Sequence, residues 1–196
     1  MPARVGIVGC GVISDHYAKN AAAFPSFDIV LNITPPVAHF EITRQALAAR
    51  KHLYSKKPLA LTIADASELV AEAEHNEVRL SCAPDTFLSG AFKAARAVLD
   101  SGQIGEPLSV SGAMFGAGHG DWRDLPFVAL GVQDARGIGL HDLVEGIAEG
   151  RPLRASADLA CHVVDVARTI LAAAEAGDTL AVGTTIERPA HDDLAG

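Results

Sequence analysis

The chain has 196 residues, of which 49% are hydrophobic and 20% charged, and its formal net charge is -8. This composition is too apolar for a disordered chain, and the acidic balance argues against nucleic acid or an anionic membrane as the main partner. The 3 cysteines are widely spaced and form no disulfide framework, no apolar run reaches the ~20 residues of a membrane span, and the N-terminus lacks the apolar region of a signal peptide. We therefore expect a cytoplasmic protein.

Apolar runs alternate with segments of helical spacing through the first half of the chain. Strands that alternate with helices are typical of a parallel α/β sheet. In chain order, the pattern predicts a strand over 5–8, a helix over 12–23, a strand over 28–33, a helix over 37–50, a strand over 52–55, a helix over 62–75 and a strand over 78–82.

The second half of the chain is less regular. A helix is predicted over 89–101, followed by a weakly alternating strand over 108–115. The longest helix is predicted over 156–176. Its large apolar residues form one stripe, which consists of Leu159, Val163, Val166, Ile170 and Leu171.

Residues 9–14 form a glycine loop that follows a strand and opens a helix. Such a loop binds the pyrophosphate of a dinucleotide, because backbone and helix N–H groups there are free to donate. Ser14 stands in place of the third glycine of the fingerprint, and the next strand ends in Asn32 and Thr34 without the acid that would bind ribose hydroxyls. From the loop alone, an adenosylmethionine-binding turn and an ordinary strand-to-helix turn stay open.

Four segments in one order resemble the Gfo/Idh/MocA family, the relatives of glucose-fructose oxidoreductase and inositol dehydrogenase. They are residues 5–11, 33–39, 54–60 and 83–87, and weaker matches at 102–107, 137–139 and 150–156 extend the resemblance over most of the chain. The resemblance implies an N-terminal dinucleotide-binding Rossmann domain over residues 1–86. It also implies a C-terminal α/β domain over 87–196, with an open sheet for substrate binding and oligomerisation, which is incomplete here.

The resemblance implies NAD or NADP as cofactor and places Lys57 near the nicotinamide, as a catalytic residue that helps to move a proton. The dipeptide alone favours a solvated basic pair at a strand end, and the flanking resemblance reverses this for Lys57 but not for Lys56. For His39, a histidine satisfied locally at a helix start is the alternative. The cofactor-binding residues that the resemblance implies are Gly9, Gly11, Val12, Ile13, Thr34, Pro35, Pro36, His39, Lys57, Pro58 and Asp85.

Two stretches of the family's chain have no counterpart in this sequence. Near residues 27–30 the family has a second strand, a helix and a third strand, and near 118–123 it has a catalytic glycine run with an acid and a further polar group. We therefore expect spatial breaks at both places, as in a longer parent protein from which these parts were left out. The alternative is a natural deletion, which predicts an unbroken chain. His141 and Asp142 are interpreted as structural, and no metal site is predicted, His162 and Asp165 included.

The function that the resemblance implies is an NAD(P)-dependent oxidoreductase. It would transfer a hydride between nicotinamide and a hydroxyl-bearing carbon of a sugar, cyclitol or related polyol, and would assemble as a dimer or tetramer. The alternative is a non-catalytic dinucleotide-binding or assembly protein of the same fold. A methyltransferase is a third hypothesis, but it leaves Lys57 and Pro58 without an explanation.

Overall fold

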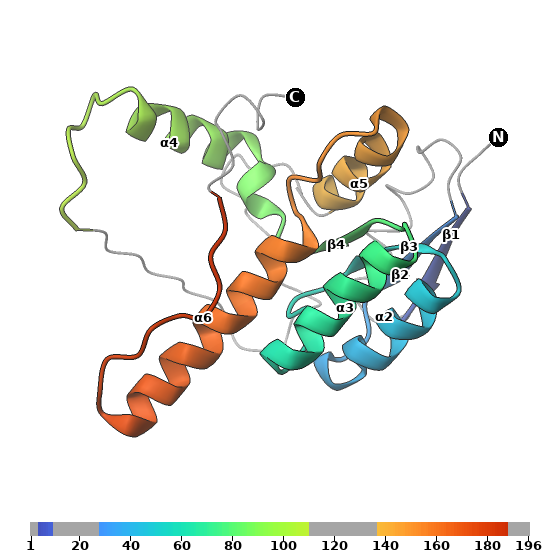
Figure 1. The fold of residues 1–196 in the computed structure, drawn as a ribbon. Helices are drawn as coiled ribbons and strands as arrows, with labels where there is room; N and C mark the ends of the chain where they lie inside the picture. Colours follow the sequence, from blue (N-terminus) through green and yellow to red (C-terminus); the bar gives the residue numbers. More distant parts are fainter. Residues whose placement is uncertain (1–3, 10–27, 110–136, 188–196) are drawn as a thin grey trace, which may run out of the picture.

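A computed structural model describes residues 4–9, 28–109 and 137–187 of the chain. Its centre is a sheet of four parallel strands in sequential order (Figure 1). The strands are β1 (Arg4–Val8), β2 (Asp28–Asn32), β3 (His52–Ser55) and β4 (Leu80–Cys82). The parallel α/β sheet expected from the sequence is therefore confirmed, with each strand within two residues of its predicted bounds.

The helices between β2, β3 and β4 are also those that the pattern predicts. The short 3-10 helix η1 (Pro36–Ala38) leads into α2 (His39–Ala48), which connects β2 to β3. Helix α3 (Ile63–His75) connects β3 to β4, and the Thr62 hydroxyl caps it by accepting the Asp65 N–H at 3.1 Å. Both crossovers lie on the same face of the sheet, as a shared crossover hand requires (Figure 1).

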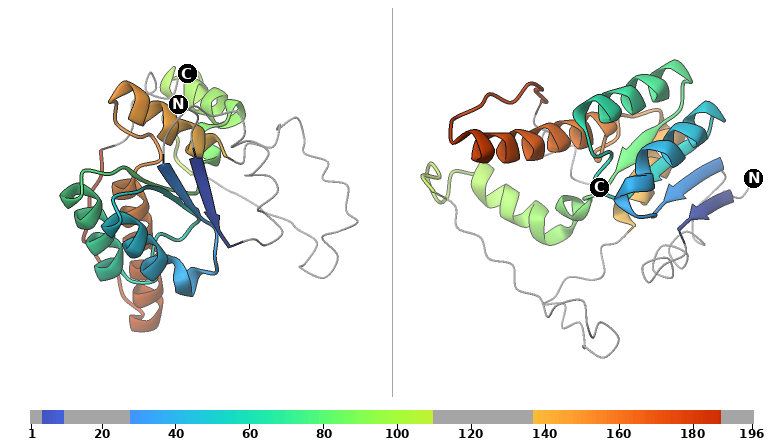
Figure 2. Two further views of the ribbon diagram at one scale, coloured as in Figure 1. Left: turned by 90° about the vertical axis from the view of Figure 1, so that its right-hand side faces the viewer. Right: turned by 90° about the horizontal axis from the view of Figure 1, so that it is seen from below.

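Within the described residues, one 3-10 helix and three α-helices follow β4. The 3-10 helix η2 (Thr86–Leu88) precedes α4 (Gly90–Asp100), which extends away from the sheet (Figure 1). Helices α5 (Ile138–Glu149) and α6 (Ala157–Ala176) come late in the sequence but return to the sheet, as the two views in Figure 2 show. The sheet is therefore covered by helices from both halves of the chain.

The two faces of the sheet have separate apolar cores. On one face, α2, α3 and the first half of α6 pack on residues such as Leu53 and Leu80, both almost fully buried. On the other face, α5 places Leu140 and Leu143 against Ile29, and all three side chains are at most 2% exposed. The carboxyl edge of the sheet is thus held between two packed layers.

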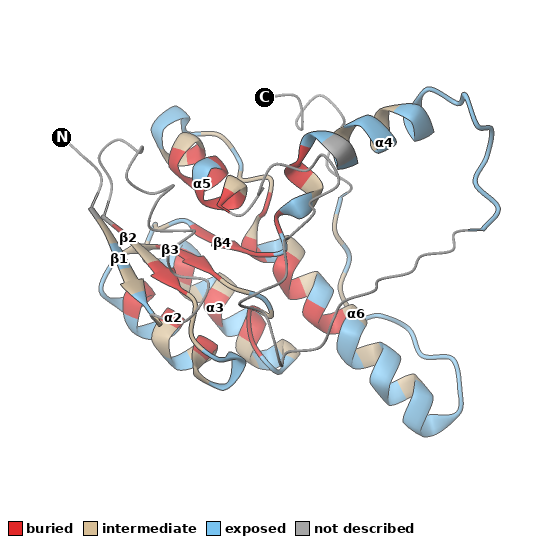
Figure 3. Ribbon diagram, turned by 180° about the vertical axis from the view of Figure 1, so that it is seen from behind, coloured by how far each residue is buried: buried red, intermediate tan, exposed pale blue. Residues whose placement is uncertain are grey.

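The apolar stripe predicted for the last helix is only partly covered: Leu159 and Val166 are half-buried, and the other three residues are exposed. Val163, Ile170 and Leu171 are 45%, 63% and 55% exposed, and the outer half of α6 extends past the sheet (Figure 3). The buried positions of α6 are mainly small residues, Ala157, Ala160, Cys161 and Val164. Small side chains are needed here because the start of α6 lies close to β4, where Ser81 and Ser156 form a β-bridge.

Several sequence-based expectations lie outside the described residues. These are the helix over 12–23, residues 110–115 of the strand over 108–115, and the breaks expected at residue 27 and at 118–123. Residues 28–30 belong to β2 without interruption. The boundary between residues 86 and 87 stays a prediction. None of the helices in the described ranges is long and apolar enough to cross a membrane.

Candidate functional site

The carboxyl ends of all four strands meet at one edge of the sheet, because the strands are parallel. The ladder of backbone hydrogen bonds continues one residue past the strands: the N–H groups of Ile33, Lys56 and Ala83 donate to carbonyls of the neighbouring strands at 2.9, 2.8 and 2.9 Å. Thr34 and Lys57 follow directly. In open α/β sheets, ligands bind in the crevice outside these carboxyl ends.

Gly9 ends β1 at a point where no side chain fits. Its φ angle is +97°, and a Cβ atom there would lie 2.8 Å from both the carbonyl carbon of Ile33 and the nitrogen of Thr34. Only glycine lets the chain after β1 pass this close to the chain after β2. The other residues predicted in this loop, Gly11, Val12 and Ile13, lie outside the described residues.

Asn32 organises the turn after β2, a role that its position at the end of an apolar strand does not by itself reveal. Its buried amide oxygen accepts the Thr34 hydroxyl at 2.7 Å and the Thr34 N–H at 3.3 Å. Its amide nitrogen donates to the Thr43 hydroxyl at 3.2 Å and to the His39 carbonyl at 3.3 Å. A polar residue at the end of an apolar strand was the signal, because an amide supplies both donors and acceptors. Pro35 and Pro36 follow on the surface.

His39 lies at the first position of α2 and is fully buried. Its Nδ1 lies 2.6 Å from the Pro58 carbonyl oxygen, and its Nε2 lies 2.8 Å from the Thr34 carbonyl oxygen. Both ring nitrogens are therefore engaged by backbone, as in the locally satisfied histidine that the sequence left open. Direct binding of a cofactor by His39 stays a prediction. The ring joins the loop after β2 to the loop after β3.

Lys57 is exposed at the end of β3, whereas Lys56 beside it is half-buried. The Lys56 carbonyl accepts the Ser55 hydroxyl at 3.1 Å, which holds this turn against the strand. Among the described residues, no hydrogen-bond partner occupies the Lys57 ammonium group. The structure therefore places an exposed amine at the carboxyl edge, and its catalytic role stays a prediction.

Asp85 follows β4 and is only 4% exposed. Its Oδ2 accepts the Gly139 N–H at 2.7 Å, at the N-terminus of α5, where a carboxylate is favoured by the free N–H groups and the helix dipole. Cofactor binding by Asp85 stays a prediction, and the structure gives this carboxylate a second task, holding α5 on the sheet. Burial, and then the charge of Asp85, raise the pKa of the neighbouring Cys82 thiol.

Asp142 is buried in α5 and supports the structural role expected for it. Its carboxylate accepts Arg151 Nη1 at 2.8 Å and the Arg154 N–H at 2.7 Å, so it holds the segment between α5 and α6. The adjacent His141 is exposed, with Nδ1 3.4 Å from a Glu145 oxygen.

His162 and Asp165 share a hydrogen-bond partner, Thr184. Thr184 lies 2.8 Å from His162 Nδ1 through its hydroxyl and donates its backbone N–H to Asp165 Oδ2 at 2.7 Å. The hydrogen bonds from Thr184 hold the pKa of Asp165 below its usual range. In the part of the chain that the structure describes, no group of three or more His, Cys, Asp or Glu side chains is arranged to hold a metal ion.

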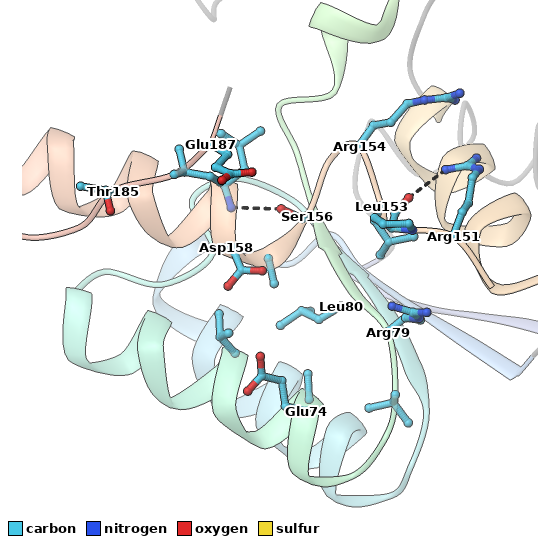
Figure 4. Close-up of a pocket in the computed structure, with 17 residues that line it drawn as sticks. Glu74, Arg79, Leu80, Arg151, Leu153, Arg154, Ser156, Asp158, Thr185 and Glu187 are labelled. Carbon is cyan, nitrogen blue, oxygen red and sulfur yellow. Dashed lines mark hydrogen bonds between the residues drawn. The ribbon is translucent and has the colours of Figure 1, made fainter. Parts of the chain in front are cut away.

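A cleft of about 1000 Å³ lies at the opposite end of β4, between α3 and the segments 151–159 and 185–187 (Figure 4). It is lined at the amino end of the strand by Arg79 and Leu80, with Glu74 and Asp158 nearby. The cleft is therefore separated by the strand from the carboxyl edge, where the predicted site residues gather.

Comparison with known proteins agrees with a dinucleotide-binding fold. Residues 18–83 match the family model described as "Oxidoreductase family, NAD-binding Rossmann fold". An uncharacterized oxidoreductase of Schizosaccharomyces pombe is 29% identical over 139 residues, which are 68% of this chain and 37% of that protein. A myo-inositol 2-dehydrogenase of Thermotoga maritima is 29% identical over 83 residues, or 42% of this chain and 25% of that one.

A solved structure shares 33% sequence identity with this chain: an inositol dehydrogenase homolog from Azotobacter vinelandii complexed with NADH and myo-inositol. The match covers 40% of this chain and 21% of the Azotobacter vinelandii chain, with a TM-score of 0.39. The chain spans 37% and 32% of the first two curated relatives, well under half of their length.

Proposed function

We infer that this chain is a member of the Gfo/Idh/MocA family of NAD-binding oxidoreductases, and on that basis we propose that its carboxyl edge binds NAD or NADP for hydride transfer. The substrate proposed is a sugar, cyclitol or related polyol, whose hydroxyl-bearing carbon exchanges a hydride with the nicotinamide. We also propose a cytoplasmic dimer or tetramer, in which residues 87–196 belong to a substrate and assembly domain.

The observation that supports this proposal best is the row formed by Gly9, Thr34 and Lys57 outside the parallel strands. The residues fit a dinucleotide, because the bare backbone at Gly9 leaves room for close approach at the start of a glycine loop. Thr34 is fixed by Asn32, so the neighbouring loop is preorganised. When bound, the cofactor supplies the hydride chemistry, and the protein supplies binding and orientation.

Lys57 is proposed to orient the substrate hydroxyl and to exchange its proton. Oxidation of a CH–OH group removes a hydride from carbon and a proton from oxygen, so a basic group beside the oxygen is required. An amine on a flexible, exposed stem can accept that proton and donate it back in the reverse reaction.

A non-catalytic binding protein is the second candidate. The observation that favours it is the absence, within the described residues, of an acid–base partner for Lys57, since Asp85 is buried and bonded to Gly139. The two candidates share cofactor binding and differ in turnover.

Cofactor binding is tested by titrating the chain with NADH and NADPH and following their fluorescence. We expect one of them to bind, and Gly9→Asp to abolish binding, because the carboxylate meets the phosphates and its Cβ meets the backbone of Thr34. Gly102→Asp is the matched control, since its φ is also positive, at +72°, but nothing lies within 4 Å of its Cβ position. If neither nucleotide binds the wild-type chain, the proposal is wrong.

Turnover is tested with a panel of sugars, cyclitols and polyols in the full-length protein. Lys57→Ala is expected to lower turnover by roughly a hundredfold, the usual scale for an acid–base group, and Lys57→Arg to restore little. Lys56→Ala is the control and is expected to have a modest effect. Equal small losses at both lysines would support the solvated basic pair, and binding without any turnover would support the non-catalytic candidate.

A further inference from the structure

Helix α4 begins at Gly90 without the internal cap that α3, α5 and α6 have. The first N–H groups of an α-helix have no partner within the helix. Thr62 and Ser156 supply one at α3 and α6 with their hydroxyls, and Asp85 supplies one at α5 with its carboxylate. At α4 the N-cap residue is Ser89, but its side chain forms no capping hydrogen bond, and the first turn of the helix carries no acid.

The hydroxyl of Ser89 is buried at this helix end without a partner. Ser89 is 7% exposed, and among the described residues its Oγ atom has no hydrogen-bond partner. A buried polar group in that state is destabilising, and native structures rarely keep one without a bound water, ion or ligand. From an N-cap position, a serine hydroxyl reaches the N–H groups of the first turn by rotation about χ1. The side-chain donor and the backbone donors therefore lack an acceptor at the same place.

The backbone at the start of α4 is open to a ligand. Gly90 is exposed, and no atom lies within 4 Å of the position that a Cβ atom would take there. The N–H group of Ser89 is already bonded to the Thr86 carbonyl, and that of Lys93 is bonded to the Ser89 carbonyl. Among the described residues, the N–H groups of residues 90–92 between them have no such bond. They are the donors that a ligand at this helix end would meet.

The charges of α4 favour an anion at this end. The helix dipole places partial positive charge at the N-terminus. Lys93 and Arg96 are the first two charged side chains of the helix, and its acid, Asp100, lies at the far end in an ion pair with Arg96. Asp85 precedes Ser89 by four residues, but its carboxylate is held by the start of α5. Among the described residues, no carboxylate therefore caps α4.

We propose that the N-terminus of α4 and the Ser89 hydroxyl form a binding site for a phosphate monoester. Three N–H groups and one hydroxyl suit the several oxygens of a phosphate, which is also the anion that helix N-termini bind most readily. The start of α4 lies beyond the carboxyl end of β4, and β4 is separated from β1 by two strands (Figure 3). The site is therefore distinct from the glycine loop after β1, and it does not depend on the proposed function.

Phosphate binding is tested by titrating the ¹⁵N-labelled chain with inorganic phosphate near pH 7 and following the backbone N–H signals. Sodium chloride keeps the ionic strength constant, so that general screening does not change during the titration. We expect the signals of Gly90 and Phe92 to shift and to saturate together. The signal of Leu159, whose N–H is bonded to the Ser156 hydroxyl, should stay in place. If Gly90 and Phe92 show no saturable shift, the proposal is wrong.

Two substitutions of Ser89 separate binding from folding. Ser89→Ala removes the hydroxyl and is expected to weaken phosphate binding by about tenfold or more, the scale of a hydrogen bond to a charged group. Ser89→Asp keeps a favourable N-cap residue, but its carboxylate occupies the N–H groups and repels the anion. Phosphate binding should therefore be lost in Ser89→Asp while α4 stays folded.

Ser156→Ala is the matched control, because Ser156 caps α6 and its hydroxyl is already bonded to the Leu159 N–H. It is expected to lower stability and to keep the wild-type affinity for phosphate. If Ser89→Ala and Ser89→Asp also keep that affinity, the ion binds elsewhere and the proposal is wrong.

The source of the phosphate group is identified with matched pairs of ligands. Glucose 6-phosphate against glucose tests a phosphorylated sugar, and NADPH against NADH tests the 2′-phosphate of the cofactor. In one of the pairs, the member with the phosphate monoester should bind more tightly and shift the Gly90 signal, and Ser89→Asp should remove this advantage. If neither pair shows the advantage, the assignment to phosphate monoesters is overturned. A chain that binds no nucleotide but still binds inorganic phosphate at α4 would refute the proposed function and support this site.

Discussion

Gly139 offers a sharp test of how α5 is attached to the sheet. A Cβ atom at this position would lie 2.7 Å from both Asp85 Cβ and Tyr54 Cε2, and 2.9 Å from Asp85 Oδ2. None of these atoms has free space to move into, because Asp85 is 4% exposed and Tyr54 is fully buried. Gly139→Ala must therefore push the first turn of α5 away from the sheet.

The expected loss of stability has two parts. Overpacking a well-packed site costs ~1–3 kcal/mol. Moving α5 also lengthens the 2.7 Å bond from the Gly139 N–H to Asp85, and a buried bond to a charged group contributes ~1.5–3 kcal/mol. The bond from Gly139 to Asp85 is weakened rather than removed, so its full contribution is not lost. We therefore expect Gly139→Ala to lower the free energy of unfolding by about 2–4 kcal/mol.

Urea unfolding followed by far-UV circular dichroism measures this loss. The control is Gly90→Ala at the start of α4, where nothing lies within 4 Å of the Cβ position, and where alanine should change stability by at most ~1 kcal/mol, in the stabilising direction. If Gly139→Ala unfolds within ~0.5 kcal/mol of the wild type, α5 does not dock on Asp85 as described.

Further predictions concern the buried charge, the pH dependence and the thiol chemistry of the chain. Asp142→Ala should lower the free energy of unfolding by about 2–4 kcal/mol in urea titrations, because two arginines lose their shared carboxylate, whereas Glu41→Ala on the surface should have no measurable effect. Burial, assisted by a neighbouring arginine, lowers the pKa of His52, so its neutral form stabilises the folded state above pH ~6.5 and this contribution disappears as the pH falls below that value. Between pH ~8 and ~5, the free energy of unfolding should therefore fall less for His52→Gln than for the wild type or for His75→Gln. Cys82, whose pKa is raised by burial, should react with a maleimide only as fast as the chain opens, and a rapid reaction of the folded protein that Cys82→Ser removes would contradict its burial.

The sequence predicted those parts of the fold that depend on neighbours along the chain. The strands appear as short apolar runs, and the caps at Thr62 and Ser156 appear as hydroxyl residues just before helical spacing begins, where both accept a backbone N–H. The face of α6 could not be predicted in this way. Large apolar residues mark a stripe, but Ala157 and Ala160 are buried because β4 lies too close for larger side chains.

The site could be predicted in composition but not in its contacts. The order of the glycine loop, the Thr34 turn and the Lys57 turn indicated a common edge, because parallel strands bring their carboxyl ends together. The contact between Asp85 and Gly139 joins residues 54 positions apart, and no local pattern encodes it. Likewise, the spacing of His39 from Pro58 gives no sign that a ring nitrogen will meet that carbonyl.

Helix α5 lies far along the sequence from the strands that it covers, which has a consequence for synthesis of the chain on the ribosome. One apolar face of the sheet has all its strands once β4 has been translated; it includes Ile29, Leu31 and Tyr54. The residues of α5 that cover this face, Leu140 and Leu143, are translated much later. At ~5–20 residues per second, this apolar surface stays bare for several seconds in every nascent chain. This face of the sheet therefore cannot be covered as in the folded protein until α5 has been translated.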